Sequence, residues 1–169
     1  MTGMTQPRRR GVRFVALERQ HKQIESELWS AFAHVLASSA FTLGHEVESF
    51  EAEFAEYCEV SNCVGVASGT AALSLTLQAY GIGPGDEVIV PGHTFIASAL
   101  AVAHAGATPV LCDVHEGTGL IDPEAARAVV GPRTAAIIAV HLYGRMCDMA
   151  SINTLARTNG LLVIEDAAQ

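Results

Sequence analysis

The chain has few of the residues that mark several special classes of protein. Its 169 residues include only six prolines, 6% aromatic residues and a single lysine, Lys22. With half of the residues apolar, this composition excludes a disordered or collagen-like chain. No stretch approaches the roughly 20 apolar residues of a membrane-spanning helix, and no apolar stretch directly follows the N-terminal charges as in a signal peptide. We therefore expect a globular, cytoplasmic protein that does not enter a membrane.

The four cysteines do not have the spacing of a cysteine-based site. They are Cys58, Cys63, Cys112 and Cys147, and they form neither a CxxC pair nor a zinc-binding pattern. Three of them lie in or beside apolar runs. We expect reduced thiols that are mostly buried, and no metal site.

Positive charge is concentrated at the N-terminus of a chain whose net charge is −8. Six of the ten basic residues lie within residues 1–22, including Arg8, Arg9 and Arg10. A nucleic-acid-binding protein normally has a basic face on its folded body. We therefore interpret residues 1–16 as a basic flexible tail and predict no nucleic-acid partner; an anionic partner for the tail is the alternative.

Residues 17–60 have the periodicity of helices. A first helix is predicted from Leu17 to Ala37, and a second after Gly44. The apolar positions of the first helix are Ile24, Leu28, Trp29, Phe32, Val35 and Leu36, and those of the second are Val47, Phe50, Phe54 and Tyr57. Most glutamates of the second helix lie on its other faces, which indicates a solvated acidic surface.

From residue 61 onward, short β-branched runs alternate with alanine-rich helical stretches. The predicted strands are 62–67, 87–90, 108–112, 134–140 and 161–164. Their starts lie 21 to 27 residues apart, which is the length of a strand, a crossover helix and two short loops. Asp122-Pro123 is typical of a helix start, whereas Gly81 and Gly131-Pro132 are typical of helix ends. The pattern predicts a mostly parallel sheet covered by helices.

Three loops that follow predicted strands contain residues suited to a ligand, and ligands bind at the carboxyl ends of parallel strands. Residues 68–70 read Ser-Gly-Thr at a helix start, where free N–H groups suit a phosphate; a plain helix cap is the alternative. Phe95 follows another predicted strand, and its ring either stacks on a ligand or packs in the core. Asp166 ends the last strand, where a carboxylate needs a cation or several hydrogen-bond donors.

Four motifs occur in the order that they have in one enzyme family. They are Ser-Gly-Thr-Ala-Ala-Leu from Ser68, Pro-Gly-His-Thr-Phe-Ile-Ala from Pro91, Val-His-Leu-Tyr-Gly from Val140 with a following Asp148-Met149, and Val-Ile-Glu-Asp-Ala-Ala-Gln from Val163. Together with Gly-His-Glu-Val-Glu-Ser-Phe-Glu from Gly44, they make residues 41–169 resemble the DegT/DnrJ/StrS family of sugar aminotransferases, which depend on pyridoxal 5'-phosphate (PLP).

The resemblance implies a fold and a domain organisation. The fold class is α/β, the N-terminal part of a fold type I (aspartate aminotransferase-like) large domain, with a mostly parallel sheet and helices on both faces. Residues 17–60 are then N-terminal helices, and residues 61–169 an incomplete cofactor-binding large domain. The C-terminal small domain of the family is absent from this sequence.

The resemblance also implies cofactor-binding residues, which are Gly69, Thr70, Ala71, Phe95, Asp166 and Gln169. The first three hold the phosphate of PLP at a helix start. Phe95 stacks on the pyridine ring, Asp166 pairs with the protonated ring nitrogen, and Gln169 reaches the 3-hydroxyl side. His141 lies near the same rim, either as packing or as a ligand contact.

The reaction that the resemblance implies transfers an amino group from an amino acid, such as glutamate, to a keto group of a nucleotide-linked sugar. Such reactions serve polysaccharide or secondary-metabolite biosynthesis, and the full-length form is expected to be a homodimer. The partners are thus a keto sugar and an amino-acid donor.

The catalytic lysine of the family, which forms the aldimine with PLP, is expected beyond Gln169. Lys22 lies outside every matching motif and is not a substitute for it. We therefore expect an N-terminal fragment that has no catalytic residue of its own and is inactive alone. Two alternatives are a non-catalytic remnant that serves as an interaction module, and a PLP-dependent sugar dehydratase in which histidine replaces the lysine.

Overall fold

The computed structural model describes residues 11–169, and the chain divides between Gly65 and Val66 into two compact units. The basic triplet Arg8, Arg9 and Arg10, with most of the tail predicted at 1–16, lies outside the described residues. Among the described residues, no helix has the length and apolar character needed to cross a membrane.

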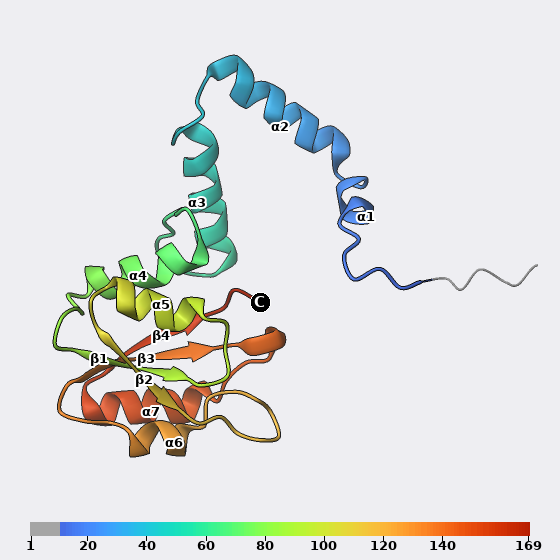
Figure 1. The fold of residues 1–169 in the computed structure, drawn as a ribbon. Helices are drawn as coiled ribbons and strands as arrows, with labels where there is room; N and C mark the ends of the chain where they lie inside the picture. The colour runs from blue at the N-terminus through green and yellow to red at the C-terminus, as the bar shows by residue number, and fades with distance from the viewer. Residues whose placement is uncertain (1–10) are drawn as a thin grey trace, which may run out of the picture. The chain divides into compact units, whose positions relative to one another are not determined.

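The N-terminal unit consists of helices α1 (Glu18–His21), α2 (Glu25–Ser38) and α3 (His45–Tyr57) (Figure 1). The prediction of one helix from Leu17 to Ala37 is therefore wrong, because the chain leaves helical geometry between α1 and α2, at Ile24, with φ −116° and ψ 17°. None of the residues of α1 or α2 is buried. Since tertiary packing supplies most of a helix's stability, there is little here to hold one continuous helix together.

The second predicted helix is confirmed as α3. Gly44 precedes it with φ +109°, a backbone conformation that favours glycine. The rings of Phe50 and Phe54 stack along the apolar stripe of α3, with centroids 5.5 Å apart. His34 Nδ1 lies 2.7 Å from Glu46 Oε1, so a polar contact joins α2 to α3.

The strand predicted at 62–67 does not form. A strand needs a neighbour for its backbone groups, and the structure pairs none with this segment among the described residues. Instead, the N–H of Gly65 donates to Glu51 Oε1 over 2.6 Å. The side chain of Val64 is 76% exposed, so burial does not hold the segment either.

The C-terminal unit contains a four-stranded parallel sheet with the order β2-β1-β3-β4. Its strands are β1 (Glu87–Pro91), β2 (Thr108–Cys112), β3 (Thr134–Val140) and β4 (Leu162–Asp166). The four predicted strands from residue 87 onward are thus confirmed, with small shifts at the ends of β1 and β4. The register places Val140 beside Asp166, so β3 and β4 end together.

Two helices cover each face of the sheet (Figure 1). Helices α4 (Gly69–Ala79) and α5 (Ala97–His104) lie on one face, and α6 (Pro123–Ala128) and α7 (Met149–Asn159) on the other. A short 3-10 turn, η1 (Leu142–Gly144), follows β3. Asp122 caps α6 as predicted, accepting the N–H of Glu124 at 2.9 Å, and Gly81 follows α4 with φ +74°.

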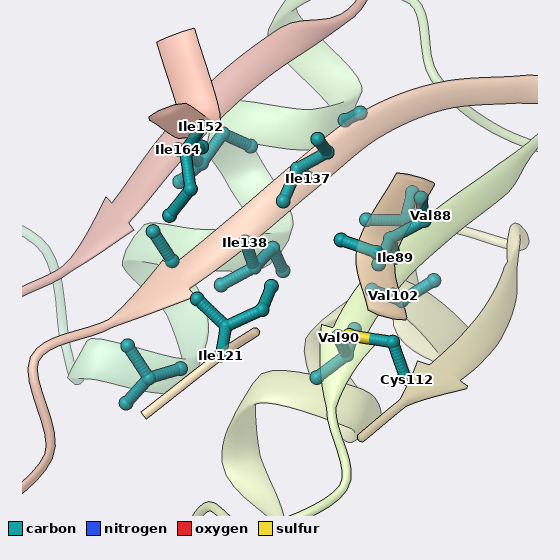
Figure 2. Close-up of a cluster of buried hydrophobic side chains, with 14 of the residues drawn as sticks. Val88, Ile89, Val90, Val102, Cys112, Ile121, Ile137, Ile138, Ile152 and Ile164 are labelled. Atoms are coloured by element: carbon teal, nitrogen blue, oxygen red, sulfur yellow. The ribbon is translucent and has the colours of Figure 1, made fainter. Parts of the chain in front are cut away.

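The core lies around the two central strands. Figure 2 shows Val88, Ile89 and Val90 of β1 beside Ile137 and Ile138 of β3. All five side chains are fully buried. Successive side chains of a strand point to opposite faces, so burial of consecutive residues requires helices on both sides of the sheet. This burial holds the ends of β1, β3 and β4 at one edge.

The cysteines differ from one another in exposure. All four are free thiols; Cys112 and Cys147 are buried, Cys63 is half-buried and Cys58 is exposed. Burial, with a smaller contribution from the charge of Asp122, raises the pKa of Cys112 to about 11. Burial also raises the pKa of Cys147. The expectation of mostly buried thiols therefore holds for two of the four.

These differences predict how the thiols react. The thiolate is the reactive species, so a thiol reagent at neutral pH should label Cys58 first and Cys63 more slowly. Cys112 and Cys147 should react only after unfolding. Mass spectrometry with and without urea measures the order after cleavage at glutamate, which places the four cysteines in separate peptides; Cys58→Ser should remove the fast phase. Rapid labelling of Cys112 in the folded protein would contradict the burial of this residue at the end of β2.

Candidate cofactor site

A cavity of about 350 Å³ opens where the sheet meets the start of α4. It lies at the carboxyl ends of the strands, the usual place of a ligand in a parallel sheet. Its lining residues are Gly69, Thr70, Leu73, Thr94, Phe95, Ala97, Val140, Leu142, Asp166, Ala168 and Gln169. Five of the six predicted cofactor residues are among them, so the structure brings together side chains from three separate motifs.

One end of the cavity is formed by the N-terminus of α4. Ser68 is the capping residue, and its Oγ accepts the N–H of Ala71 at 3.1 Å. The N–H groups of Gly69 and Thr70 have no partner within the helix, because the first turn of a helix leaves its donors free. Ala71 differs from the other predicted residues: its N–H is engaged by the cap, and it does not line the cavity.

Space remains open at Gly69. A side-chain carbon added there would meet no atom within 4 Å. The free N–H groups and the positive end of the helix dipole favour an anion at this place. This end of the cavity thus suits a phosphate group.

The carboxylate of Asp166 lines the same cavity. Its Oδ2 accepts a hydrogen bond from Ser98 Oγ at 2.9 Å, and its Oδ1 accepts the N–H of Ala168 at 3.3 Å. Ser98 is fully buried on α5 and lies 3.2 Å from Thr94 Oγ1. Two neutral donors therefore fix the carboxylate in place.

Asp166 has no positive partner in the part of the chain that the structure describes. The ion pairs of residues 11–169 involve Arg13, Arg127, Arg133, His34 and His141, and none of them reaches Asp166. A half-buried carboxylate with no cation is stabilised by a positively charged ligand. The cavity therefore suits a molecule that carries both an anionic and a cationic group.

Phe95 and Gln169 also line the cavity. The ring of Phe95 is 73% exposed, so it is available to a ligand and is not core packing. Oε1 of Gln169 accepts the N–H of Tyr143 at 2.5 Å. That contact leaves the amide NH₂ of Gln169 free to donate.

His141 is buried beside the site but does not line the cavity. Its Nδ1 accepts the N–H of Cys147 at 3.2 Å, its Nε2 lies 2.8 Å from Glu165 Oε2, and its backbone N–H donates to the carbonyl of Asp166 at 3.0 Å. Both ring nitrogens are thus occupied by protein groups. Of the two sequence interpretations, the contacts favour packing over ligand binding.

Other parts of the molecule lack the chemistry of this site. A larger hollow of about 590 Å³ runs along α1 and α2, where Lys22 and apolar side chains such as Trp29 line it, and no predicted cofactor residue does. Among residues 11–169, no group of three His, Cys, Asp or Glu side chains is placed to hold a metal ion.

Sequence reasoning missed Ser98. It is the only polar residue apart from the terminal histidine in the segment Ala-Ser-Ala-Leu-Ala-Val-Ala-His that forms α5. A hydroxyl in such an apolar helix needs a partner when it is buried. That signal indicates a hydrogen bond but does not identify Asp166 as the acceptor.

Comparison with known proteins agrees with the family resemblance of the sequence motifs. Residues 22–169 match the model of the DegT/DnrJ/EryC1/StrS aminotransferase family. The chain is 50% identical over 158 residues to a dTDP-3-amino-3,4,6-trideoxy-alpha-D-glucose transaminase of Streptomyces venezuelae, covering 94% of this chain and 42% of that protein. It is 48% identical to a dTDP-3-amino-3,6-dideoxy-alpha-D-galactopyranose transaminase of Aneurinibacillus thermoaerophilus, covering 92% of this chain and 43% of that protein.

Solved structures agree in fold. The S. venezuelae protein DesV, crystallised in complex with a ketimine intermediate, superposes with a TM-score of 0.92 at 50% identity, over 94% of this chain and 43% of DesV. NtdA of Bacillus subtilis, with bound cofactor PMP, superposes with a TM-score of 0.89 at 35% identity, over 94% of this chain and 37% of NtdA.

The predicted fold class is confirmed: a parallel sheet with helices on both faces, equivalent to the N-terminal portion of PLP-dependent aminotransferases. The chain spans about two-fifths of the length of these relatives. With its family model matched from Lys22 to the last residue, the chain belongs to the DegT/DnrJ/EryC1/StrS aminotransferase family.

Proposed function

We propose that this chain forms the phosphate-binding and ring-binding half of a PLP site, in an enzyme that moves an amino group from an amino acid such as glutamate to a keto group of a nucleotide-linked sugar. The observation that supports this best is the polarity of the cavity. Free helix N–H groups and a carboxylate without a cationic partner among residues 11–169 line the same cavity. PLP has the matching charges, a phosphate and a protonated pyridine nitrogen.

At the phosphate end, Gly69 and Thr70 are the proposed donors. Their N–H groups are free in the first turn of α4, and the absence of a side chain at Gly69 allows close approach. Ala71 stays a predicted contact that requires its N–H to be shared with Ser68 Oγ.

At the ring end, Asp166 is proposed to hold a proton on the pyridine nitrogen. At contact, the attraction between the two charges is about 4 kcal/mol for an effective dielectric constant of about 20. Ser98 and Ala168 keep the carboxylate oriented through their hydrogen bonds, and Phe95 offers a ring face for stacking. The amide of Gln169 is proposed to donate toward the 3-hydroxyl side.

When bound, PLP supplies an electron sink for the carbon from which the amino group leaves. The described residues bind the cofactor and keep its ring positively charged. Proton transfer at the reacting carbon is assigned to the lysine that the family resemblance places C-terminal to Gln169. The substrates and the homodimer are proposals that follow from the same relatives, several of which are named for nucleotide-linked sugars.

The test is transamination by the full-length protein supplied with PLP. Addition of glutamate alone should convert the absorbance of bound PLP to that of its amino form, and a nucleotide-linked keto sugar should restore it. A sugar dehydratase would release water from the sugar without consuming stoichiometric glutamate, and a non-catalytic remnant would show neither change. An unchanged spectrum with glutamate and a panel of other amino acids would overturn the proposal.

The phosphate end predicts a separate binding result. Gly69→Val adds a branched side chain to the open space at the start of α4, so the dissociation constant of PLP should rise at least about tenfold. The melting temperature of the apoprotein should change little, because a Cβ at this position meets no protein atom within 4 Å. Equilibrium dialysis measures the constant, and Ala79→Val at the exposed far end of α4 is the matched control. Unchanged PLP affinity in Gly69→Val would place the phosphate elsewhere.

A further inference from the structure

Tyr143 has an unusual backbone conformation beside the cavity. It is the middle residue of η1, with φ +59° and ψ 24°, in the left-handed region that favours glycine. In this region the Cβ of an L-residue crowds its own carbonyl oxygen, and a bulky residue is rarely found there. Leu142, the residue before it, lines the cavity.

Hydrogen bonds hold this conformation, whereas burial does not. The N–H of Tyr143 donates to Gln169 Oε1 at 2.5 Å, and the N–H of Gly144 donates to the carbonyl of His141 at 3.1 Å. The Tyr143 side chain is 77% exposed. The strained backbone thus positions a solvent-exposed aromatic ring. Backbone strain of this kind is typical of a functional position and not of a structural one.

A second ring meets Tyr143 at this rim. The ring of His93 lies edge-on to it, with centroids 6.2 Å apart and an interplanar angle of 64°. His93 Nδ1 lies 3.2 Å from the carbonyl oxygen of Gly119, which orients the imidazole. Both rings have sequence neighbours that line the cavity, Thr94 and Leu142, and the N–H of Tyr143 bonds to the lining residue Gln169, so the pair forms an aromatic edge beside the cavity.

We infer that this edge, Tyr143 with His93, contacts the hexose ring of the sugar substrate, an assignment that rests on the proposed function. A hexose has an apolar C–H face that packs on an aromatic ring, and hydroxyl groups that pair with a phenol or an imidazole nitrogen. The amino-acid donor is small and ionised, and neither ring offers a fixed positive charge for its carboxylates. The edge therefore determines the affinity for the sugar and leaves the reaction with the amino donor unchanged.

The test compares Tyr143→Asn with Tyr143→Phe in the full-length protein. Asparagine adopts the left-handed conformation readily but has no ring, so the variant should melt at or above the temperature of the wild type. Its KM for the nucleotide-linked keto sugar should rise about tenfold, as expected for the loss of one aromatic contact. Tyr143→Phe keeps the ring, and its KM should stay within about threefold of the wild type.

The amino-donor half-reaction separates this inference from the proposed function. Its rate with glutamate alone should be the same in Tyr143→Asn and in the wild type. The variant Tyr80→Asn is the control for loss of a surface ring, because Tyr80 is another exposed tyrosine, at the C-terminal end of α4. It should leave both the KM for the keto sugar and the KM for glutamate unchanged. A wild type without the half-reaction would overturn the proposed function, whereas an unchanged sugar KM in an active Tyr143→Asn would overturn the aromatic edge alone.

Discussion

Asp166→Ala is expected to lower the rate of transamination at least about a thousandfold. The carboxylate lines the cavity, and it has no cationic partner among residues 11–169. Losing an attraction of about 4 kcal/mol corresponds to about three orders of magnitude in rate or binding. The PLP dissociation constant should rise as well. Steady-state kinetics and dialysis of the full-length protein measure the two effects.

Two further variants identify the cause of the loss. Asp166→Asn keeps the shape of the side chain without its charge and should be nearly as impaired as the alanine variant. Ser98→Ala keeps the charge but removes the 2.9 Å hydrogen bond that orients it, so a loss of about tenfold is expected. Glu124→Gln, on the exposed surface of α6, is the neutral control. An active Asp166→Asn would show that the charge is not needed.

Ile137→Ala is expected to lower the free energy of unfolding by about 2–5 kcal/mol, the usual cost of such a truncation in a packed core. Ile137 is fully buried in β3, where it pairs with Ile89 of β1 and Val163 of β4 (Figure 2). The central strands cannot collapse into the space that is left, because helices cover both faces of the sheet. Urea unfolding followed by circular dichroism measures the change.

The matched control for the core prediction is Leu111→Ala in β2. Leu111 is a strand residue of the same sheet but is 60% exposed, so its truncation should cost less than about 1 kcal/mol. Equal losses in the two variants would contradict the distinction between a buried central strand and an exposed edge strand.

Local chemistry made much of the sheet predictable. The apolar runs at 87–90, 108–112 and 134–140 are bounded by turn residues, and they fold as β1, β2 and β3. Helices bury both faces of the central strands β1 and β3. The helix ends at Asp122 and Gly81 follow from side-chain capping and from left-handed backbone geometry. These features depend on a few neighbouring residues and are therefore visible in a sequence.

Features that depend on distant partners could not be predicted in the same way. Residues 62–67 have the composition of a strand, but a strand also needs an adjacent strand, which the described residues do not supply. The break near Ile24 contains neither glycine nor proline, and it reflects the lack of burial along α1 and α2.

The candidate site also combines features that depend on neighbouring residues with features that depend on distant partners. Motifs located the residues of the cavity wall, since each motif sits at one strand end or helix start. The bond from Ser98 to Asp166 joins residues 68 positions apart, and the strained backbone of Tyr143 depends on the side chain of Gln169. Neither has a local signal that identifies its partner.

The order β2-β1-β3-β4 has a consequence for how the protein acquires its cofactor during synthesis. Gly69 and Gln169 face the same cavity although 100 residues separate them along the chain. Chains emerge from the ribosome N-terminus first, and contacts between distant residues form slowly. A ligand therefore cannot contact both Gly69 and Gln169 until the residues between them have been synthesised. Before that point, the nascent chain can be kept compact only by burial of core side chains, among them the isoleucines and valines of β1 and β3.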